Sequence, residues 1–283
     1  MVRRRLYFAL TVLLLLAGAM QVQSAELKPK TAQAFAHYVD LTEKKVQARL
    51  ASGPYLWIDT LPEGQRQAAY EQLRRGEVLI ERLETREDGH EIDIPDGMVH
   101  HWVATAFIPK VSAAQVLGVM QDYNDHEKIY SKEVIKSRLL AQDGNTYRVF
   151  LRLYKKKIVT VVLNTEHEAL FQQVSPNRYF SRSHATRIAE VEEPGTAKEE
   201  EKPPGRGVGF LWRMQTYWRL EQREGGVFVE CEVVSLTRDI PFAFRWIVKP
   251  LVTAIPRESL TYTMTATRAA VERRFRAANT STN

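Results

Sequence analysis

The sequence predicts an α+β protein in which a run of antiparallel strands is flanked by helices near the two ends of the chain. Apolar residues recur at helical spacing within residues 29–51 and again in the C-terminal region. Most of the chain between them alternates with a period of two. A Gly225-Gly226 pair divides two such alternating runs, which is typical of a two-residue hairpin. Strands grouped in the middle with helices at the ends indicate an α+β fold.

Residues 1–24 have the three parts of a secretory signal peptide. Three arginines begin the segment, an apolar run follows over Leu6–Ala19, and small residues stand at Ser24 and Ala25. We expect cleavage after Ser24 or Ala25, and therefore an exported protein that is periplasmic or secreted. The alternative is an uncleaved anchor, but the apolar run is shorter than the roughly 20 residues that cross a bilayer.

Charge and cysteine content narrow the function classes. Residues 1–24 carry three arginines and no acidic residue, so the formal charge falls from +6 to +3 without them. No stripe of Lys and Arg is interleaved with aromatics, so we expect no nucleic-acid partner. Lys155–Lys157 is interpreted as a solvated turn, with transient membrane contact as the minor alternative. The single cysteine, Cys231, excludes an internal disulfide, and its place between Glu230 and Glu232 predicts a buried thiol.

The N-terminal part of the mature chain is predicted to be helical. Helices are expected over 29–51 and 62–75, and Gly76 ends the second one. We therefore divide the chain into the signal segment 1–24, a helical extension over 25–75 and a ligand-binding domain over 76–278.

The ligand-binding domain begins with strands and one well-marked helix. Ser112 and Gln115 have the spacing of a capping box at the start of that helix. A polar, irregular segment follows over 122–130. Turn signals then separate the remaining alternating runs. The strands are expected over 77–83, 98–108, 132–141, 146–154, 158–170, 178–191, 209–223 and 227–238.

Two segments of this domain depart from the regular pattern. Residues 192–207 contain three prolines and many charges but no large apolar side chain, which predicts a long flexible loop. A final helix is expected over 242–276, kinked or divided at Pro250 and Pro256.

The order of these elements resembles START-like (SRPBCC) domains, especially the polyketide-cyclase and coenzyme-Q-binding branches. The residues that carry the resemblance open helices or fill strands: Ser112–Tyr123, Lys132–Leu140, Tyr217–Leu220 and Pro256–Leu260. The resemblance covers about residues 77–276. It implies a helix-grip fold, in which a curved antiparallel sheet wraps around a long C-terminal helix, and it implies a cavity for a hydrophobic ligand. The charged loop and the N-terminal helices depart from the minimal family pattern.

Alternation predicts which side chains line that cavity. On residues 210–220 one face carries aromatic, Met and apolar side chains, and residues 147–153 have an equivalent face. The stripe on the last helix would face both. The expected ligand-binding residues are Tyr147, Leu151, Trp212, Met214, Trp218, Leu260 and Met264.

The sequence contains no catalytic motif that would define a reaction. His100 and His101 are adjacent, so a strand would point them to opposite faces. His167 lies between Glu166 and Glu168, whose carboxylates share the strand face opposite the histidine. That glutamate face is interpreted as solvated rather than as a two-glutamate metal or acid–base site. Tyr147 and His184 are the candidates for a titratable pair if the cavity is catalytic. We expect no catalytic residue, no metal site and no cofactor.

These observations predict an exported binding protein that holds a lipid, isoprenoid or polyketide-like molecule between the sheet and the C-terminal helix. Two alternatives remain open at this point. One is a cyclase or dehydratase that uses the same cavity. The other is a structural or interaction protein whose core is completely filled, with an unknown protein partner.

Overall fold

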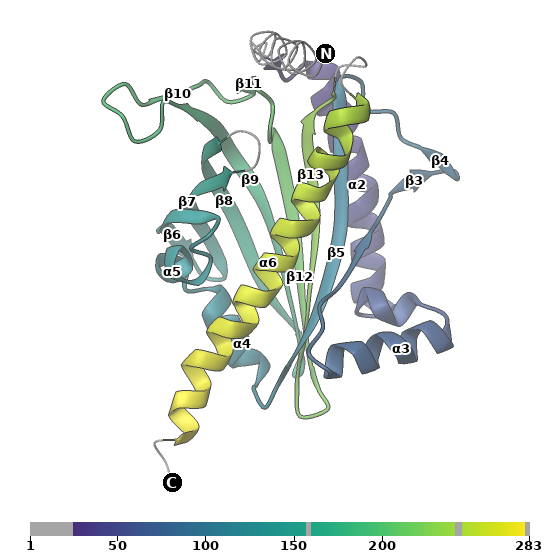
Figure 1. Ribbon diagram of the computed structural model, residues 1–283. Helices are drawn as coiled ribbons and strands as arrows, with labels where there is room; N and C mark the ends of the chain where they lie inside the picture. The colour runs from purple at the N-terminus through teal and green to yellow at the C-terminus, as the bar shows by residue number, and fades with distance from the viewer. Residues whose placement is uncertain (1–24, 157–159, 241–244, 281–283) are drawn as a thin grey trace, which may run out of the picture.

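A computed structural model describes residues 25–156, 160–240 and 245–280. The predicted signal peptide lies outside the described residues. A long curved sheet dominates the molecule (Figure 1), and all of its strand pairs are antiparallel. Its strands, in spatial order, are β2 (Leu79–Arg82), β5 (Gly97–Pro109), β13 (Gly226–Arg238), β12 (Arg213–Arg223), β9 (Arg178–Glu192), β8 (Thr160–Ser175), β7 (Thr146–Lys156) and β6 (Val134–Asp143).

The helices and short strands lie around this sheet. The helical elements are α2 (Pro29–Ser52), η1 (Trp57–Thr60), α3 (Glu63–Arg74), α4 (Ala113–Met120), η2 (Tyr123–Asp125), α5 (His126–Ile129) and α6 (Arg245–Thr280). The short strands are β1 (Ala25–Glu26), β3 (Arg86–Glu87), β4 (His90–Glu91), β10 (Glu200–Glu201) and β11 (Arg206–Gly207). None of the helices in the described part of the chain is long and apolar enough to cross a membrane.

Local sequence signals account for several of these elements. The Ser112 hydroxyl accepts from the Gln115 N–H at 3.2 Å, and the Gln115 side chain accepts from the Ser112 N–H at 2.8 Å. The predicted capping box at the start of α4 is therefore confirmed. The expected hairpin is also present, but its turn is one residue earlier than predicted. Arg223 pairs with Gly226, so the two turn residues are Glu224 and Gly225, and Gly226 begins β13.

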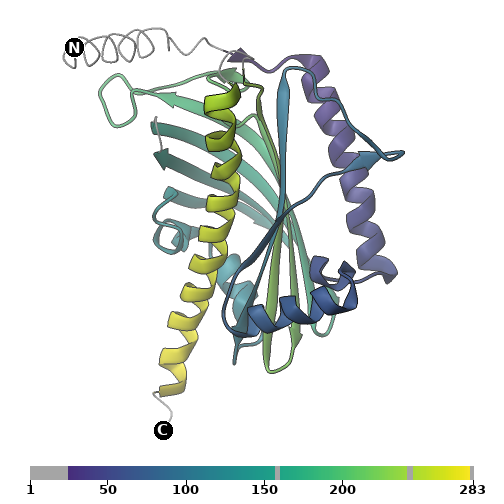
Figure 2. The same cartoon turned by 45° about the vertical axis from the view of Figure 1, so that its right-hand side comes forward.

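The two faces of the sheet are covered by different helices. Helix α6 runs along the concave, inner face, whereas α2 and α3 lie on the convex, outer face (Figure 2). One buried apolar cluster packs between the inner face, α4 and α6, and a second packs α2 against the outer face. A third joins α3 and η1 to Phe107 and Phe228 on the outer face. The predicted helix-grip fold with an N-terminal helical extension is confirmed.

The last helix is not divided at its prolines. Helix α6 is continuous from Arg245 to Thr280, although it contains Pro250 and Pro256. Proline inside a helix removes one hydrogen bond and costs about 3 kcal/mol. The packing of Leu260, Met264 and Val271 against the inner face of the sheet offsets that cost, because all three side chains are buried in the inner cluster.

The charged segment 192–207 is also not the free loop that its composition predicted. Part of it forms β10, which pairs with β9, and part forms β11, which pairs with β1. Arg152 on β7 donates two hydrogen bonds to the Glu199 carboxylate, at 2.8 and 2.7 Å. These bonds lower the pKa of Glu199 to about 2. Ion pairs with neighbouring strands fix this segment where apolar burial does not.

Candidate functional site

The inner face of the sheet carries the candidate site, and strand alternation selects the side chains that reach it. On β12, Trp218 and Leu220 belong to the inner cluster, whereas Tyr217 belongs to the outer one. On β7, Tyr147 and Val149 face inward in the same way. Residues two apart on these strands therefore share the inner face, as the period of a strand requires.

Most of the predicted ligand-binding residues are brought together on this face. Tyr147, Leu260 and Met264 are buried in the inner cluster, and Leu151 and Trp218 pack against it while remaining partly exposed. Met214 shares the inner side of β12 with Trp218 by alternation, and it is half-buried.

Trp212 does not reach the inner face, so its assignment is corrected. It is buried in the outer cluster with Tyr217 and Leu236. Strand β12 begins at Arg213, and the Trp212 N–H donates to the Leu236 carbonyl at 2.8 Å before the regular alternation starts. The alternation that placed Trp212 with Met214 therefore does not extend to this position.

The candidate titratable pair is separated by the sheet. Tyr147 faces inward, but His184 is the cross-strand neighbour of Gln215 and Glu168, on the outer side of β9. Tyr147 and His184 therefore cannot act on one bound molecule. Among the described residues, no three His, Cys, Asp or Glu side chains are grouped so that they could hold a metal ion.

The centre of the inner face is built from small side chains. Ser183 lies directly across from Thr216 on β12 and from Ala169 on β8. In the next row, Trp218 is the cross-strand partner of both Ser181 and Cys231. Small residues beneath a helix leave room that a floor of Leu or Phe would fill. Cys231 is buried in this floor as predicted, and burial raises the pKa of its thiol.

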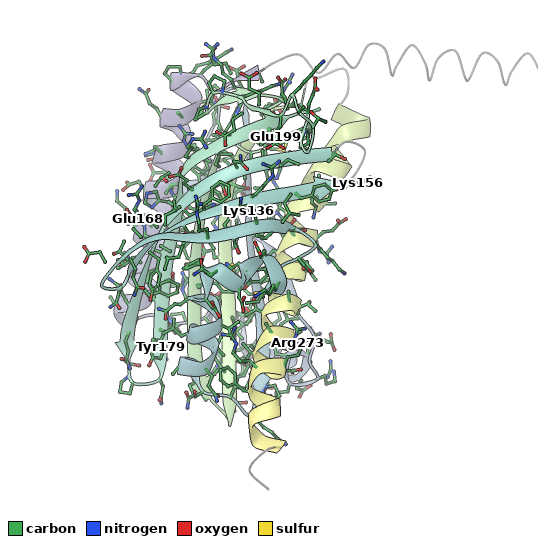
Figure 3. All side chains as sticks on the ribbon, turned by 90° about the vertical axis from the view of Figure 1, so that its left-hand side faces the viewer. Lys136, Lys156, Glu168, Tyr179, Glu199 and Arg273 are labelled. Atoms are coloured by element: carbon green, nitrogen blue, oxygen red, sulfur yellow. The ribbon has the colours of Figure 1, made fainter. Side chains whose placement is uncertain are left out.

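Larger apolar side chains around this floor are only partly buried. Trp102, Tyr179, Trp218, Val233 and Tyr262 pack against the inner cluster, yet each keeps accessible surface. The outer face differs, because the side chains of Tyr217, Arg219 and Glu230 there are completely buried. In this sheet the charged residues under α2 are thus better enclosed than several apolar residues under α6, which reverses the usual order. Figure 3 views the sheet from its β6–β7 edge, with α2 on one side and α6 on the other.

His167 is the main residue of this face that the sequence interpretation missed. It is 5% exposed and lies on β8 directly opposite Val149 of β7. Its Nε2 is 2.9 Å from the Thr165 hydroxyl oxygen, within hydrogen-bond distance. Burial lowers the pKa of His167 to about 4, so the ring is neutral at pH 7. The glutamates on either side of it are on the outer face, as expected. The signal for its burial was its alternation with Leu163, Thr165 and Ala169.

The outer face contains a buried cluster of charges that joins the N-terminal helix to the sheet. The Arg219 guanidinium donates to Glu230 at 2.9 Å and to Glu232 at 3.0 Å, and Arg49 of α2 donates to Glu232 at 2.5 Å. The His101 ring also donates to Glu232, at 3.0 Å. Burial opposes ionisation of Glu232, but the His101 bond and the two arginines outweigh it and hold its pKa well below the usual range.

This charged cluster is structural rather than a binding site. Trp57 N–H also donates to Glu230, at 2.6 Å, so η1 and α2 are both fixed to β13 from the same side. Alternation along β12 places Arg219 on the face opposite Trp218. Alternation does not show that α2 covers that face, where the buried charges must then pair with one another.

The fold is similar to that of several solved structures. These are a STAR-related lipid transfer protein from Xanthomonas axonopodis (16% identity, covering 68% of this chain and 98% of that chain, TM-score 0.44), the Zhui aromatase/cyclase from a Streptomyces species (14%, 64% and 98%, 0.43) and a START superfamily protein from Mycobacterium smegmatis (11%, 61% and 97%, 0.41). Two of the three are named as STAR-related or START superfamily proteins. At these identities the likeness is one of fold, and it transfers neither ligand nor activity. No protein-family model matches the chain, and no curated protein is similar to it in sequence.

Proposed function

We propose that this protein is an exported carrier that holds a lipid, isoprenoid or polyketide-like molecule between the inner face of the sheet and α6. One observation supports this most directly: apolar side chains that face inward keep accessible surface around a floor of small residues. A concave, mostly apolar site with a few polar groups is the usual form of a small-molecule site. Tyr147, Leu151, Met214, Trp218 and Met264 would contact the ligand.

Export is part of the same proposal. It rests on the three-part segment at residues 1–24. N-terminal sequencing of the protein purified from its own host tests it. A chain that begins at Ala25 or Glu26 supports cleavage and export, and a chain that still carries the apolar segment contradicts cleavage.

Native mass spectrometry of the purified mature protein tests the carrier function. A stoichiometric apolar molecule that is released on denaturation supports a carrier and identifies the ligand class. Conversion of that molecule on incubation would indicate the cyclase-type enzyme instead. A protein without bound molecule that also shows no thermal shift with a lipid panel contradicts the proposal.

A filling substitution gives a sharper test of the same site. Ser183→Leu adds volume at the centre of the inner floor, opposite Thr216. If the space is open, ligand binding falls at least tenfold while the unfolding free energy changes by less than the roughly 1–3 kcal/mol of overpacking in a filled core. Arg182→Leu, one residue away on the exposed outer side, is the matched control and leaves binding unchanged.

A further inference from the structure

The hydrogen bonds of Thr165 determine which nitrogen of His167 carries its proton. The Thr165 hydroxyl has one hydrogen, and it donates that hydrogen to the Leu151 carbonyl at 3.0 Å. A carbonyl oxygen can only accept. The 2.9 Å contact between Thr165 Oγ1 and His167 Nε2 therefore requires that Nε2 carries the hydrogen and donates it. In the neutral ring this leaves Nδ1 as a bare acceptor.

This acceptor has no partner among the residues that the structure describes. Within the described residues, His167 makes one side-chain hydrogen bond, through Nε2, and its cross-strand neighbours Val149 and Ala185 offer no side-chain donor. The hydroxyls of Ser181, Ser183 and Thr216 likewise have no side-chain partner in the described parts of the chain.

The unpartnered polar atoms of the inner face are not completely enclosed by protein. Within the described residues, the buried side-chain atoms that are both enclosed and unpartnered belong to other positions: Trp212, Gln215, Arg219, Glu221 and Arg223. His167 Nδ1 and the three hydroxyls are absent from that set, so each keeps a small accessible surface. A polar group that is shielded from bulk water needs a partner, which here must come from water or from a ligand.

The inner floor also lacks charge. The inward-facing positions of β7 over 147–151, β8 over 165–171, β9 over 179–185 and β12 over 214–220 carry no Lys, Arg, Asp or Glu. A carboxylate or phosphate group would find no cation at these positions, because Lys155, farther along β7, is already paired with Glu133 and Ser259. Such an anion also could not donate to Nδ1. Burying such an anion without a partner is strongly unfavourable.

We propose that the ligand is an uncharged, mostly apolar alcohol or phenol, and that its hydroxyl donates a hydrogen bond to His167 Nδ1. Ser183 lies two residues along β9 from Ala185, the cross-strand neighbour of His167, and its hydroxyl is the nearest candidate for a second bond. This inference rests on the proposed carrier function, because it specifies which hydrophobic molecules that site accepts. It makes His167 a specificity-determining residue rather than a catalytic one.

A matched pair of ligands tests the inference. We would titrate the mature protein at pH 7 with 2-naphthol and with its methyl ether, 2-methoxynaphthalene, and follow quenching of tryptophan fluorescence. The two molecules share an apolar body, but only the naphthol can donate. One hydrogen bond to a shielded acceptor predicts that the naphthol binds about 5- to 10-fold more tightly.

Two histidine variants locate the effect. His167→Phe keeps the ring volume and removes the acceptor, so it should bind both molecules with equal affinity. His184→Phe, on the outer face of the neighbouring strand, is the control and should keep the preference for naphthol. Thr165→Val is a second inner variant in case His167→Phe does not fold. It keeps the imidazole but removes the hydroxyl that holds the ring proton on Nε2. The preference for naphthol over its methyl ether should therefore become smaller.

The outcomes separate the two proposals. Binding of both molecules by the wild type without preference, or a preference that persists in a folded His167→Phe protein, overturns the inference and leaves the carrier function standing. Failure of the wild type to bind either molecule, together with no response to a lipid panel, overturns the carrier function itself. A preference that is lost only in the inner-face variants establishes the hydroxyl recognition.

Discussion

Acid should destabilise this protein well before its carboxylates are protonated. His100, His126 and His167 are between 4% and 8% exposed, and burial is the main cause that lowers the pKa of each from 6.5 to about 4. The folded state thus holds three neutral imidazoles that the unfolded chain would protonate below pH 6.5. Because the unfolded state binds more protons, stability falls as the pH falls from 6.5 towards 4.

The expected magnitude follows from these pKa values. At pH 5, a histidine with a pKa near 6.5 when unfolded and about 4 when folded contributes about 2 kcal/mol less stability than at pH 7. The three together amount to about 5 kcal/mol, which is comparable to the whole stability of many domains. Glu230 acts in the opposite direction, because burial raises its pKa, but it is one group against three.

Urea unfolding at pH 7, 6 and 5, followed by tryptophan fluorescence, measures this effect. His126→Phe should reduce the slope of unfolding free energy against pH by about 1 kcal/mol per pH unit between pH 5 and 6, because it removes one of the three protons. His90→Asn, at an exposed position, is the control and should leave the slope unchanged. A wild-type stability that is equal at pH 7 and pH 5, or a slope that His126→Phe does not change, would refute the reasoning.

Three further predictions concern the outer face and the charged segment. Arg219→Met leaves the buried Glu230 and Glu232 without one of their cations and should lower the unfolding free energy, measured with urea, by about 3–5 kcal/mol. An unchanged unfolding free energy would show that the cluster is solvated. Gly207→Ala places a Cβ against the Glu190 carboxylate at a residue with φ of 129°, so the amides that bond this carboxylate should exchange faster with solvent. Arg152→Gln removes both bonds to Glu199, and limited proteolysis should then cut within residues 193–199 at native temperatures, whereas unchanged resistance would contradict the role of this ion pair.

Several features of this protein are determined by the sequence alone. Alternation along β7 and β12 assigns Tyr147, Leu151 and Trp218 to one face of the sheet, and helical spacing puts Leu260 and Met264 on one stripe of the last helix. The capping residues of α4 act through neighbouring backbone groups, so a local pattern specifies them completely. The glycine pair predicted the hairpin between β12 and β13, although its turn is Glu224-Gly225. Export and cleavage remain predictions from the N-terminal pattern.

Other features depend on which elements meet, and only the tertiary structure decides them. Alternation states that Arg219 and Trp218 lie on opposite faces, but not that α2 covers the face of Arg219 while the face of Trp218 stays partly open. The sequence pattern does not show that the regular alternation of β12 begins at Arg213, and for this reason Trp212 was assigned to the wrong face. Alternation along β8 also assigns His167 to the inner face. Its burial, the position of its ring proton and its unpartnered Nδ1 depend on the contacts with the neighbouring strands β7 and β9. Periodicity assigns a side chain to a face, whereas its charge state and partners depend on long-range contacts that a local pattern does not contain.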